Sequence, residues 1–469
     1  MSNVVMALLS SLLWLSTAAL QAAETPATMR LDYLHTGGPA GEIFSVDRIV
    51  IEPLPWPGPK QSPLETTGLG SYRFDIEDEN GTVLYSRGFA SIYGEWMLTE
   101  EARRVHQTFS ESVRFPAPKV PVDVVIYARD RENAFLEAWR TRIDPRDMFV
   151  DRSRPPAQTL RTIEQNGASP DNVDLLLLGD GYTAAECADK FPRDARRMTE
   201  ALFRYQPFAR RRKDFNVWGL CPPAEQTGIS RPSTGMHHYT PVGATYDVFG
   251  SERYVLTFEN RRWRDIAAWA PYEAVEILVN SETYGGGGIF HLYSTVAVDN
   301  DWADYLFVHE FGHHFAALAD EYYTSPVEYL PPEEIIEPWE RNVTALADPK
   351  TVKWRELVSA ETPLPTPWPK EKFEAFQKDY QARRREIRAQ NLPESVMSEL
   401  FREEQRFTSG LFSEARYRDT VGAFQGANYD AKAFFRSELD CVMFTRNEVP
   451  FCRVCQQAIE EVIQLYAPR

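Results

Sequence analysis

The stretch His309–Tyr322 constrains this chain most, because it contains two histidines and a glutamate in the spacing HExxH. Residues four apart lie one turn along the same face of a helix, so His309 and His313 can both present an imidazole nitrogen to one ion at about 2.0–2.1 Å. Glu310 lies beside them and can take a proton from an attacking water. The preceding residues Tyr305–Val308 are apolar enough to bury such a helix. The pattern predicts a Zn²⁺-dependent hydrolase.

The competing interpretation is a pair of core histidines on a buried helix. Only eight histidines occur in 469 residues, so HExxH arises by accident with a chance on the order of one per cent. The length allows two or three domains, and 43% hydrophobic and 25% charged residues are ordinary for a globular protein. The net charge of -17 argues against a nucleic-acid binder and against a binder of anionic membranes.

The N-terminus is typical of an export signal. The apolar run Val4–Leu20 is followed by small residues at Ala22 and Ala23, and it is marginally short for a membrane span. Residues 1–23 are therefore predicted to be a signal peptide, which places the mature protein in the periplasm, on the cell surface or outside the cell. An uncleaved N-terminal anchor is the alternative.

The cysteines suit an exported protein with one or two disulfides. The chain has five of them: Cys187, Cys221, Cys441, Cys452 and Cys455. A single Cys-x-x-Cys is weak support for a redox pair or a zinc knuckle, so a local disulfide near the C-terminus is the expectation. The odd count leaves at least one free thiol.

Residues 24–150 are predicted to form a β-sandwich. Phe74–Glu77 and Val83–Ser86 alternate in hydrophobicity on either side of Asn80-Gly81, which is a strong hairpin signal. Further strands are expected at Val122–Tyr127 and Phe135–Ile143. Helical periodicity of convincing length is missing from this part of the sequence, which favours an all-β module.

The remaining residues, 151–469, have the pattern of a mixed α/β domain. Val173–Leu178 predicts a buried strand that is followed by a turn and a helix. Further buried strands are expected at Phe215–Leu220 and Ala274–Val279. Gly285–Gly288 either allows another backbone to approach closely, at the rim of a cleft, or forms a flexible loop. Residues 324–419 are predicted to be an insertion that is partly a helical hairpin.

Two histidines need a third protein ligand if one position is to stay open for catalysis. Asp320 is the nearest candidate, but on a continuous helix it would lie about 10 Å beyond His313 along the axis. For Asp320 to bind, the helix must break within Phe315–Ala319, although these residues include strong helix formers, and we expect zinc binding to stabilise that bend. Glu321 is the neighbouring alternative. A downstream glutamate, as in thermolysin-like sites, would have to be Glu328, Glu333 or Glu334.

From Val173 to the C-terminus the sequence resembles the secreted bacterial immunoglobulin A peptidase family of zinc metallopeptidases. The matching stretches are Leu178–Thr183, Phe215–Trp218, Tyr284–Gly288, His309–His313, Leu318–Tyr322, Gly422–Phe424, Cys441–Phe444 and Phe451–Cys455. The N-terminal module, with Asp32-Tyr33 and Val50–Pro55, resembles the β domain that precedes the peptidase in such proteins. The resemblance covers nearly the whole mature chain.

This resemblance implies a metzincin-like architecture. The fold class expected is therefore α+β/α/β, an N-terminal β-sandwich followed by a metzincin-like mixed α/β zinc-peptidase domain with a helical insertion. The implied metal ligands are His309, His313 and Asp320, with Glu310 as the general base and Met443 as the methionine beneath the metal.

The sequence departs from the metzincin pattern at two places. Metzincins have a glycine and the third ligand where this chain has Ala316 and Ala319, one residue before Asp320. Astacins place an oxyanion-stabilising tyrosine where this chain has Thr445. Tyr322 and Tyr429 are the candidates for that role here.

The function expected is that of a secreted zinc metalloendopeptidase acting on a protein or glycoprotein, with immunoglobulin A as one candidate substrate. One alternative is a peptidase that requires a glycan beside the scissile bond. Another is an inactive relative whose β module binds glycan or protein, and the intact histidines and glutamate argue against it. No nucleic-acid partner is expected, and no membrane contact beyond an N-terminal anchor.

Overall fold

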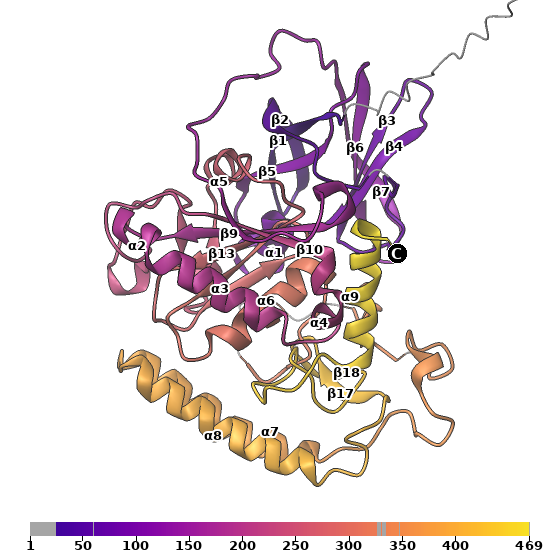
Figure 1. Ribbon diagram of the computed structural model, residues 1–469. Coiled ribbons are helices and arrows are strands. Elements are labelled where there is room, and N and C mark those ends of the chain that lie inside the picture. The colour runs from indigo at the N-terminus through magenta and orange to yellow at the C-terminus, as the bar shows by residue number, and fades with distance from the viewer. Residues whose placement is uncertain (1–24, 60, 326–329, 331–333, 347, 469) are drawn as a thin grey trace, which may run out of the picture.

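A computed structural model (Figure 1) describes residues 25–468 apart from 60, 326–329, 331–333 and 347. The predicted signal peptide, residues 1–23, lies outside the described residues, as do the alternative ligands Glu328 and Glu333. The described chain is a mixed α/β protein with several sheets, and its N-terminal strands are antiparallel.

Two antiparallel sheets form the N-terminal region and share one apolar core. The first has the order β2-β1-β5, with β1 (Ala27–Gly38), β2 (Gly41–Pro55) and β5 (Gln107–Pro116). The second has the order β4-β3-β6-β7, with β3 (Tyr72–Glu77), β4 (Val83–Phe89), β6 (Val122–Arg129) and β7 (Phe135–Ile143). Leu31, Phe74 and Ile126 are buried in the core between them. The predicted hairpin and both later strands are present, in an arrangement typical of a β-sandwich.

A short helix interrupts this region where none was expected. Helix α1 (Ile92–Met97) begins after Ser91, whose hydroxyl accepts a hydrogen bond from the amide of Gly94 at 2.9 Å. It packs Tyr93 and Trp96 against the sheet that contains β1 and β5. A helix this short gives no periodic signal in sequence, which is why the pattern missed it.

A six-stranded sheet, in the order β14-β15-β13-β9-β10-β8, forms the centre of the second region. The four inner strands, which run parallel, are β9 (Val173–Asp180), β10 (Phe215–Leu220), β13 (Ala274–Val279) and β15 (Tyr293–Ala297). The antiparallel edge strands are β8 (Arg161–Glu164) and β14 (Gly286–Ile289). A small separate pair consists of β11 (Ala244–Thr245) and β12 (Leu256–Thr257).

Helices cover both faces of this sheet (Figure 1). Leu175 and Leu177 of β9 pack with α3 (Lys190–Leu202) and α6 (Ala303–Ala316), whereas Leu176 and Leu178 pack on the side of α5 (Asn260–Ala267). Burial on both faces explains why β9 is a continuous apolar run and does not alternate. The two remaining short helices here are α2 (Ala184–Ala188) and α4 (Phe208–Arg211).

The described part of the chain beyond α6 adds a small sheet and three α-helices. The sheet has the order β16-β18-β17, with β16 (Val343–Thr344), β17 (Phe424–Ala427) and β18 (Asp430–Arg436). Helices α7 (Lys370–Ala389) and α8 (Glu394–Ser413) form the predicted helical hairpin, in which Phe376 stacks on Phe407 with ring centroids 4.0 Å apart. Helix α9 (Arg453–Tyr466) packs against α6. Of the helices in the described residues, none combines the length and the apolar character needed to span a bilayer.

Candidate metal centre

Helix α6 carries the HExxH residues and is buried along almost its whole length. It packs against β14 and β15 of the sheet and against α3 and α9. The glycines of β14 allow this contact: a Cβ on Gly288 would lie 2.3 Å from the carbonyl oxygen of Glu310, and one on Gly286 would lie 3.1 Å from Cγ of Glu310. The glycine run is therefore an edge strand that packs against α6. Its missing side chains allow the backbone of α6 to approach closely.

The helix ends before Asp320, as the third-ligand interpretation required. Ala317 follows the last helical residue with φ 52° and ψ 37°, and its amide donates to the carbonyl of His313 at 3.0 Å. A single residue in the left-handed conformation with this hydrogen bond is a common helix C-cap, although glycine is the usual residue there. The chain turns back, so Asp320 reaches the face of α6 that carries the two histidines.

His309, His313 and Asp320 converge on one point. Asp320 Oδ1 lies 3.0 Å from His309 Nε2 and 3.2 Å from His313 Nε2, and the two Nε2 atoms are 3.2 Å apart. Ligand atoms that surround one zinc ion tetrahedrally at about 2.0–2.1 Å are about 3.3 Å from one another. The three atoms therefore have the spacing of three ligands on one ion, with a fourth position available.

Hydrogen bonds at Nδ1 fix the orientation of both imidazole rings. His309 Nδ1 donates to the carbonyl of Val442 at 3.0 Å, and His313 Nδ1 donates to the carbonyl of Leu318. When it is neutral, each ring therefore presents the lone pair of Nε2 to Asp320. Three electron-rich atoms in contact are stabilised by a positive charge between them, such as a proton or a divalent cation.

The pKa values respond to the same crowding. Burial alone would lower the pKa of His313, but the carboxylate of Asp320 outweighs burial and raises this pKa to about 9. Burial alone would raise the pKa of Asp320, yet the two histidines hold it well below its usual range. Asp320 is therefore ionised at neutral pH, and its negative charge stabilises a positive charge on or beside the two histidines.

Glu310 lies beside this cluster on α6. Burial raises the pKa of Glu310, an effect that the neighbouring His309 and His313 partly oppose. A carboxylate whose pKa is raised toward neutrality is a better general base than an exposed one. Glu310 is well placed to accept a proton from a water molecule near the histidines.

A cleft of about 610 Å³ opens in front of these residues. Its walls include the strand Gly286–Gly288, the two histidines with Glu310 and Asp320, and the aromatic residues Tyr322 and Tyr429. Such a volume admits several residues of an extended peptide. Of the two interpretations of the glycine run, the rim of a cleft is therefore the one that the structure favours.

Two family models match the chain. One is described as IgA Peptidase M64 and matches residues 162–463, and the other, described as Peptidase M64 N-terminus, matches residues 20–140. The chain belongs to the IgA peptidase M64 family. Membership identifies it as a peptidase, and M64 peptidases are generally metallopeptidases. No curated protein matches the chain.

In this M64 peptidase the β17–β18 turn contacts Asp320, the third candidate ligand. The sequence did not reveal this contact. Asn428 and Tyr429 have φ 47° and φ 62° and form a two-residue hairpin turn. The hydroxyl of Tyr429 bonds to Asp320 Oδ2, and the amide of Asn428 donates to the carbonyl of Asp320 at 2.9 Å. The turn orients Asp320 so that Oδ1 faces the histidines.

Met443 lies on the inner side of α6 in this M64 peptidase. It is fully buried, and its Sδ lies 3.0 Å from the position that a Cβ on Gly312 would take. The adjoining Val442 supplies the carbonyl that holds His309. Thr445 turns away and donates to Asp440 at 2.6 Å, so it plays no part in the cleft.

Glu321 lies outside the histidine cluster, although the sequence left it as an alternative ligand. Its carboxylate faces Cys441, Cys452 and Cys455. Glu334, the other alternative, is exposed and pairs with Arg131. Asp320 is thus the acidic residue that the structure brings to His309 and His313.

The expectation of a disulfide near the C-terminus is wrong. The disulfide that forms joins Cys187 to Cys221, which are 34 residues apart in sequence, whereas Cys441, Cys452 and Cys455 are free and buried. The spacing of these three cysteines could not reveal the acidic residue beside them, because Glu321 is 120 positions upstream of Cys441. No local pattern could connect them.

Proposed function

We propose that this M64 peptidase is an exported zinc metalloendopeptidase with a metzincin-like site. His309, His313 and Asp320 would hold the ion, and Glu310 would act as general base. The observation that carries the proposal is the tetrahedral spacing of the three ligand atoms, 3.0–3.2 Å, on the wall of a cleft of about 610 Å³.

His309, His313 and Asp320 would hold zinc, which would supply a Lewis acid for the scissile carbonyl and the attacking water. Glu310 takes the proton from the attacking water and delivers it to the nitrogen of the leaving amine. Val442 and Leu318, through their carbonyl groups, keep the two imidazoles from rotating during this transfer.

Tyr322 is our candidate for stabilising the oxyanion. Its ring stacks on His309 with centroids 6.1 Å apart, and its hydroxyl accepts hydrogen bonds from Arg253 at 3.4 Å. A hydroxyl that accepts from a guanidinium keeps its own proton to donate to substrate. Burial raises the pKa of Tyr322, so the hydroxyl stays protonated at neutral pH. Tyr429 already bonds to Asp320 and suits the role less well.

The substrate that we propose is a protein or glycoprotein, with immunoglobulin A among the candidates. A requirement for glycan is the second candidate specificity, and digestion of one glycoprotein with and without its glycans separates the two. The N-terminal β module, proposed to span residues 24–150, would present or select the substrate. Binding of glycans by this region without any cleavage would favour the non-catalytic alternative.

Glu310→Gln tests the mechanism. The variant should keep its bound zinc while kcat for peptide hydrolysis falls by about 10²–10⁴, the usual contribution of a general base. Zinc content and cleavage of casein or immunoglobulin A are the measurements. Glu399→Gln, at a glutamate on the exposed face of α8, is the matched control and should retain full activity. Unchanged hydrolysis by Glu310→Gln would refute the assignment.

A further inference from the structure

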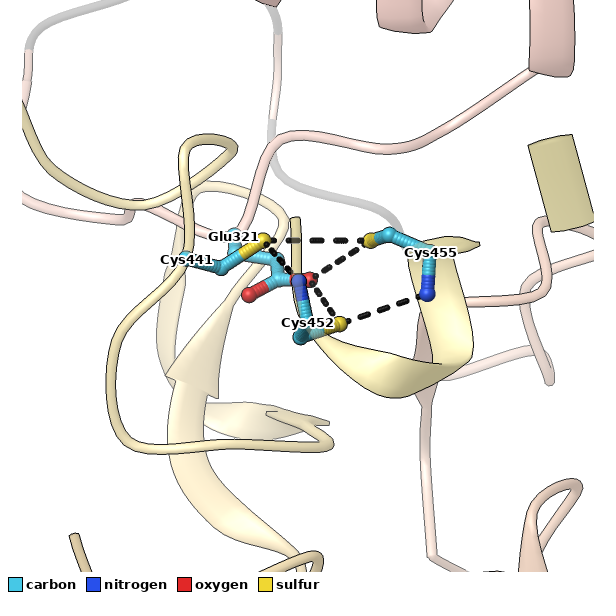
Figure 2. Close-up of side chains that lie close together, drawn as sticks. All are labelled: Glu321, Cys441, Cys452 and Cys455. Carbon is cyan, nitrogen blue, oxygen red and sulfur yellow. Dashed lines mark hydrogen bonds between the residues drawn. The ribbon is translucent and has the colours of Figure 1, made fainter. Parts of the chain in front are cut away.

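A second cluster of ligating side chains lies in the protein interior, behind the cleft. Glu321, Cys441, Cys452 and Cys455 converge from three separate segments, as Figure 2 shows. Their four ligand atoms lie within 4.8 Å of one another. The side chains are buried, with 0% exposure for three of the residues and 3% for Cys452. The mechanism proposed above uses none of these four groups.

The distances within the cluster are those of ligands around one ion. Cys441 Sγ lies 3.9 Å from Cys455 Sγ, and Glu321 Oε1 lies 3.4 Å from Cys455 Sγ and 3.7 Å from Cys452 Sγ. In a tetrahedron with Zn–S of about 2.3 Å and Zn–O of about 2.0 Å, two sulfurs lie about 3.8 Å apart and sulfur and oxygen about 3.5 Å apart. A disulfide requires sulfurs about 2.05 Å apart, so the observed spacing does not fit one.

Glu321 forms no salt bridge among the described residues, although the buried guanidinium of Arg436 acts on it from a longer distance. Asn342 Nδ2 donates to Glu321 Oε1 at 3.1 Å, but Oε2 has no hydrogen-bond partner among the described residues. No lysine, arginine or histidine among the described residues forms an ion pair with the Glu321 carboxylate. A fully buried carboxylate without a cation is costly, because burial removes its hydration and returns nothing. Oε1, the oxygen that lies among the sulfurs, is the one placed to bind a cation.

Backbone amides favour the thiolate form of Cys441 and Cys452. Cys452 caps the N-terminus of α9: its Sγ accepts from the amide of Cys455 at 3.3 Å, and its own amide donates to Cys441 Sγ at 3.2 Å. The hydroxyl of Ser437 lies 3.1 Å from Cys452 Sγ. Amide donors and the positive end of a helix both stabilise sulfur in its charged, metal-binding form.

We infer that Glu321, Cys441, Cys452 and Cys455 bind a second metal ion, a structural zinc. Three thiolates and a carboxylate in tetrahedral spacing suit Zn²⁺, and four protein ligands leave no position open to substrate. The space between atoms less than 4.8 Å apart holds one ion and is too small for a multi-iron cluster. The inference goes beyond the proposed peptidase mechanism and does not depend on it.

Such an ion would join the segments that position the catalytic ligands. Glu321 follows Asp320 directly, and its amide donates to the carbonyl of Met443 at 2.9 Å. Cys441 precedes Val442, whose carbonyl holds His309. The second ion would thus connect two loops: the one that carries Asp320 and the one that orients His309.

Metal analysis of the purified protein tests this inference. The wild type should contain two zinc ions per chain. His309→Ala/His313→Ala should retain one, and X-ray absorption at the zinc edge should then show sulfur neighbours at about 2.3 Å. Because this readout concerns only the remaining ion, it holds whether or not the proposed zinc mechanism of hydrolysis is correct. A histidine variant that contains no zinc, or zinc without sulfur neighbours, overturns the inference.

Cysteine variants give the complementary result. Cys441→Ser/Cys455→Ser should lose the sulfur-bound zinc, whereas Cys187→Ser/Cys221→Ser, which removes two sulfurs of the disulfide, should keep two ions per chain. If the first variant fails to fold, the absorption spectrum of the histidine variant still decides the question. Detection by mass spectrometry of a disulfide among Cys441, Cys452 and Cys455 in the native protein also overturns the inference.

Discussion

Two clusters of ligating side chains lie on either side of a single peptide bond, and they differ in ligand type and in accessibility. Asp320 joins two histidines on the wall of a cleft, where the side chain of His313 is 14% exposed. Glu321 joins three cysteines in the interior. Nitrogen and oxygen ligands with an open position suit catalysis, whereas sulfur ligands in a closed shell suit the stabilisation of a fold.

Chelation should produce the largest difference in behaviour between the two clusters. Dialysis against a chelator should abolish hydrolysis, and added Zn²⁺ should restore it, because the open cluster exchanges its ion with solvent. The melting temperature should hardly change, since the closed cluster keeps its ion. Zinc content, activity and thermal unfolding are measured on the same samples. Loss of both ions at the same rate would contradict the difference in accessibility.

Neutralising the adjacent acids one at a time should sharpen the comparison. Asp320→Asn should lower kcat/KM by more than about 10³, because removal of a metal ligand disables the Lewis acid. Glu321→Gln should instead destabilise the protein, by about 2 kcal/mol or more for the loss of a buried charged partner. Steady-state kinetics and denaturant unfolding distinguish the two. Equal effects of both variants on stability would show that the clusters do not have separate roles.

The tyrosines of the cleft should show smaller effects of two kinds. Tyr429→Phe removes the hydroxyl that bonds to Asp320, and groups that orient a metal ligand usually contribute 10–100-fold in metal affinity or activity. Zinc affinity should fall accordingly. Tyr322→Phe should lower kcat while leaving zinc affinity unchanged. A Tyr429→Phe variant that binds zinc like the wild type would show that the hairpin turn does not orient Asp320.

The smallest effect should come from the sheet edge behind the open cluster. Gly288→Ala places a Cβ 2.3 Å from the carbonyl of Glu310, and such overpacking typically costs about 1–3 kcal/mol of stability. Gly410→Ala on α8 has no atom within 4 Å of the new Cβ, and it should stabilise the protein by about 0.5–1 kcal/mol. Thermal unfolding gives both values. Equal stabilities of the two variants would exclude close packing as the reason for the glycine.

Features of the site and fold that depend on local residue spacing could be predicted from the sequence. HExxH places His309, Glu310 and His313 on one helix, and the buried strand β13 is found at the predicted residues, Ala274–Val279. The break of the helix before Asp320 followed from the rise per residue alone. Its form did not, because the left-handed conformation of Ala317 opposes the helix propensity of its neighbours.

Contacts between distant segments could not be read from the sequence. The bond from Tyr429 to Asp320 spans 109 positions, and the contact of Glu321 with Cys455 spans 134. The three cysteines alone suggested a disulfide, because two thiols close in sequence are the simplest partners for each other. Only the fold shows that a carboxylate lies among them and that their sulfurs are too far apart for that bond.

The left-handed turn at Ala317 also fixes the length of chain before the two acids. Asp320 and Glu321 belong to different clusters. The deletion of one residue between Ala317 and Asp320 would therefore move each following residue into the position of the one before it. Glutamate would then arrive at the histidines, and Tyr322 at the sulfurs. The loss of one residue from this short loop would therefore exchange the ligands of both clusters at once.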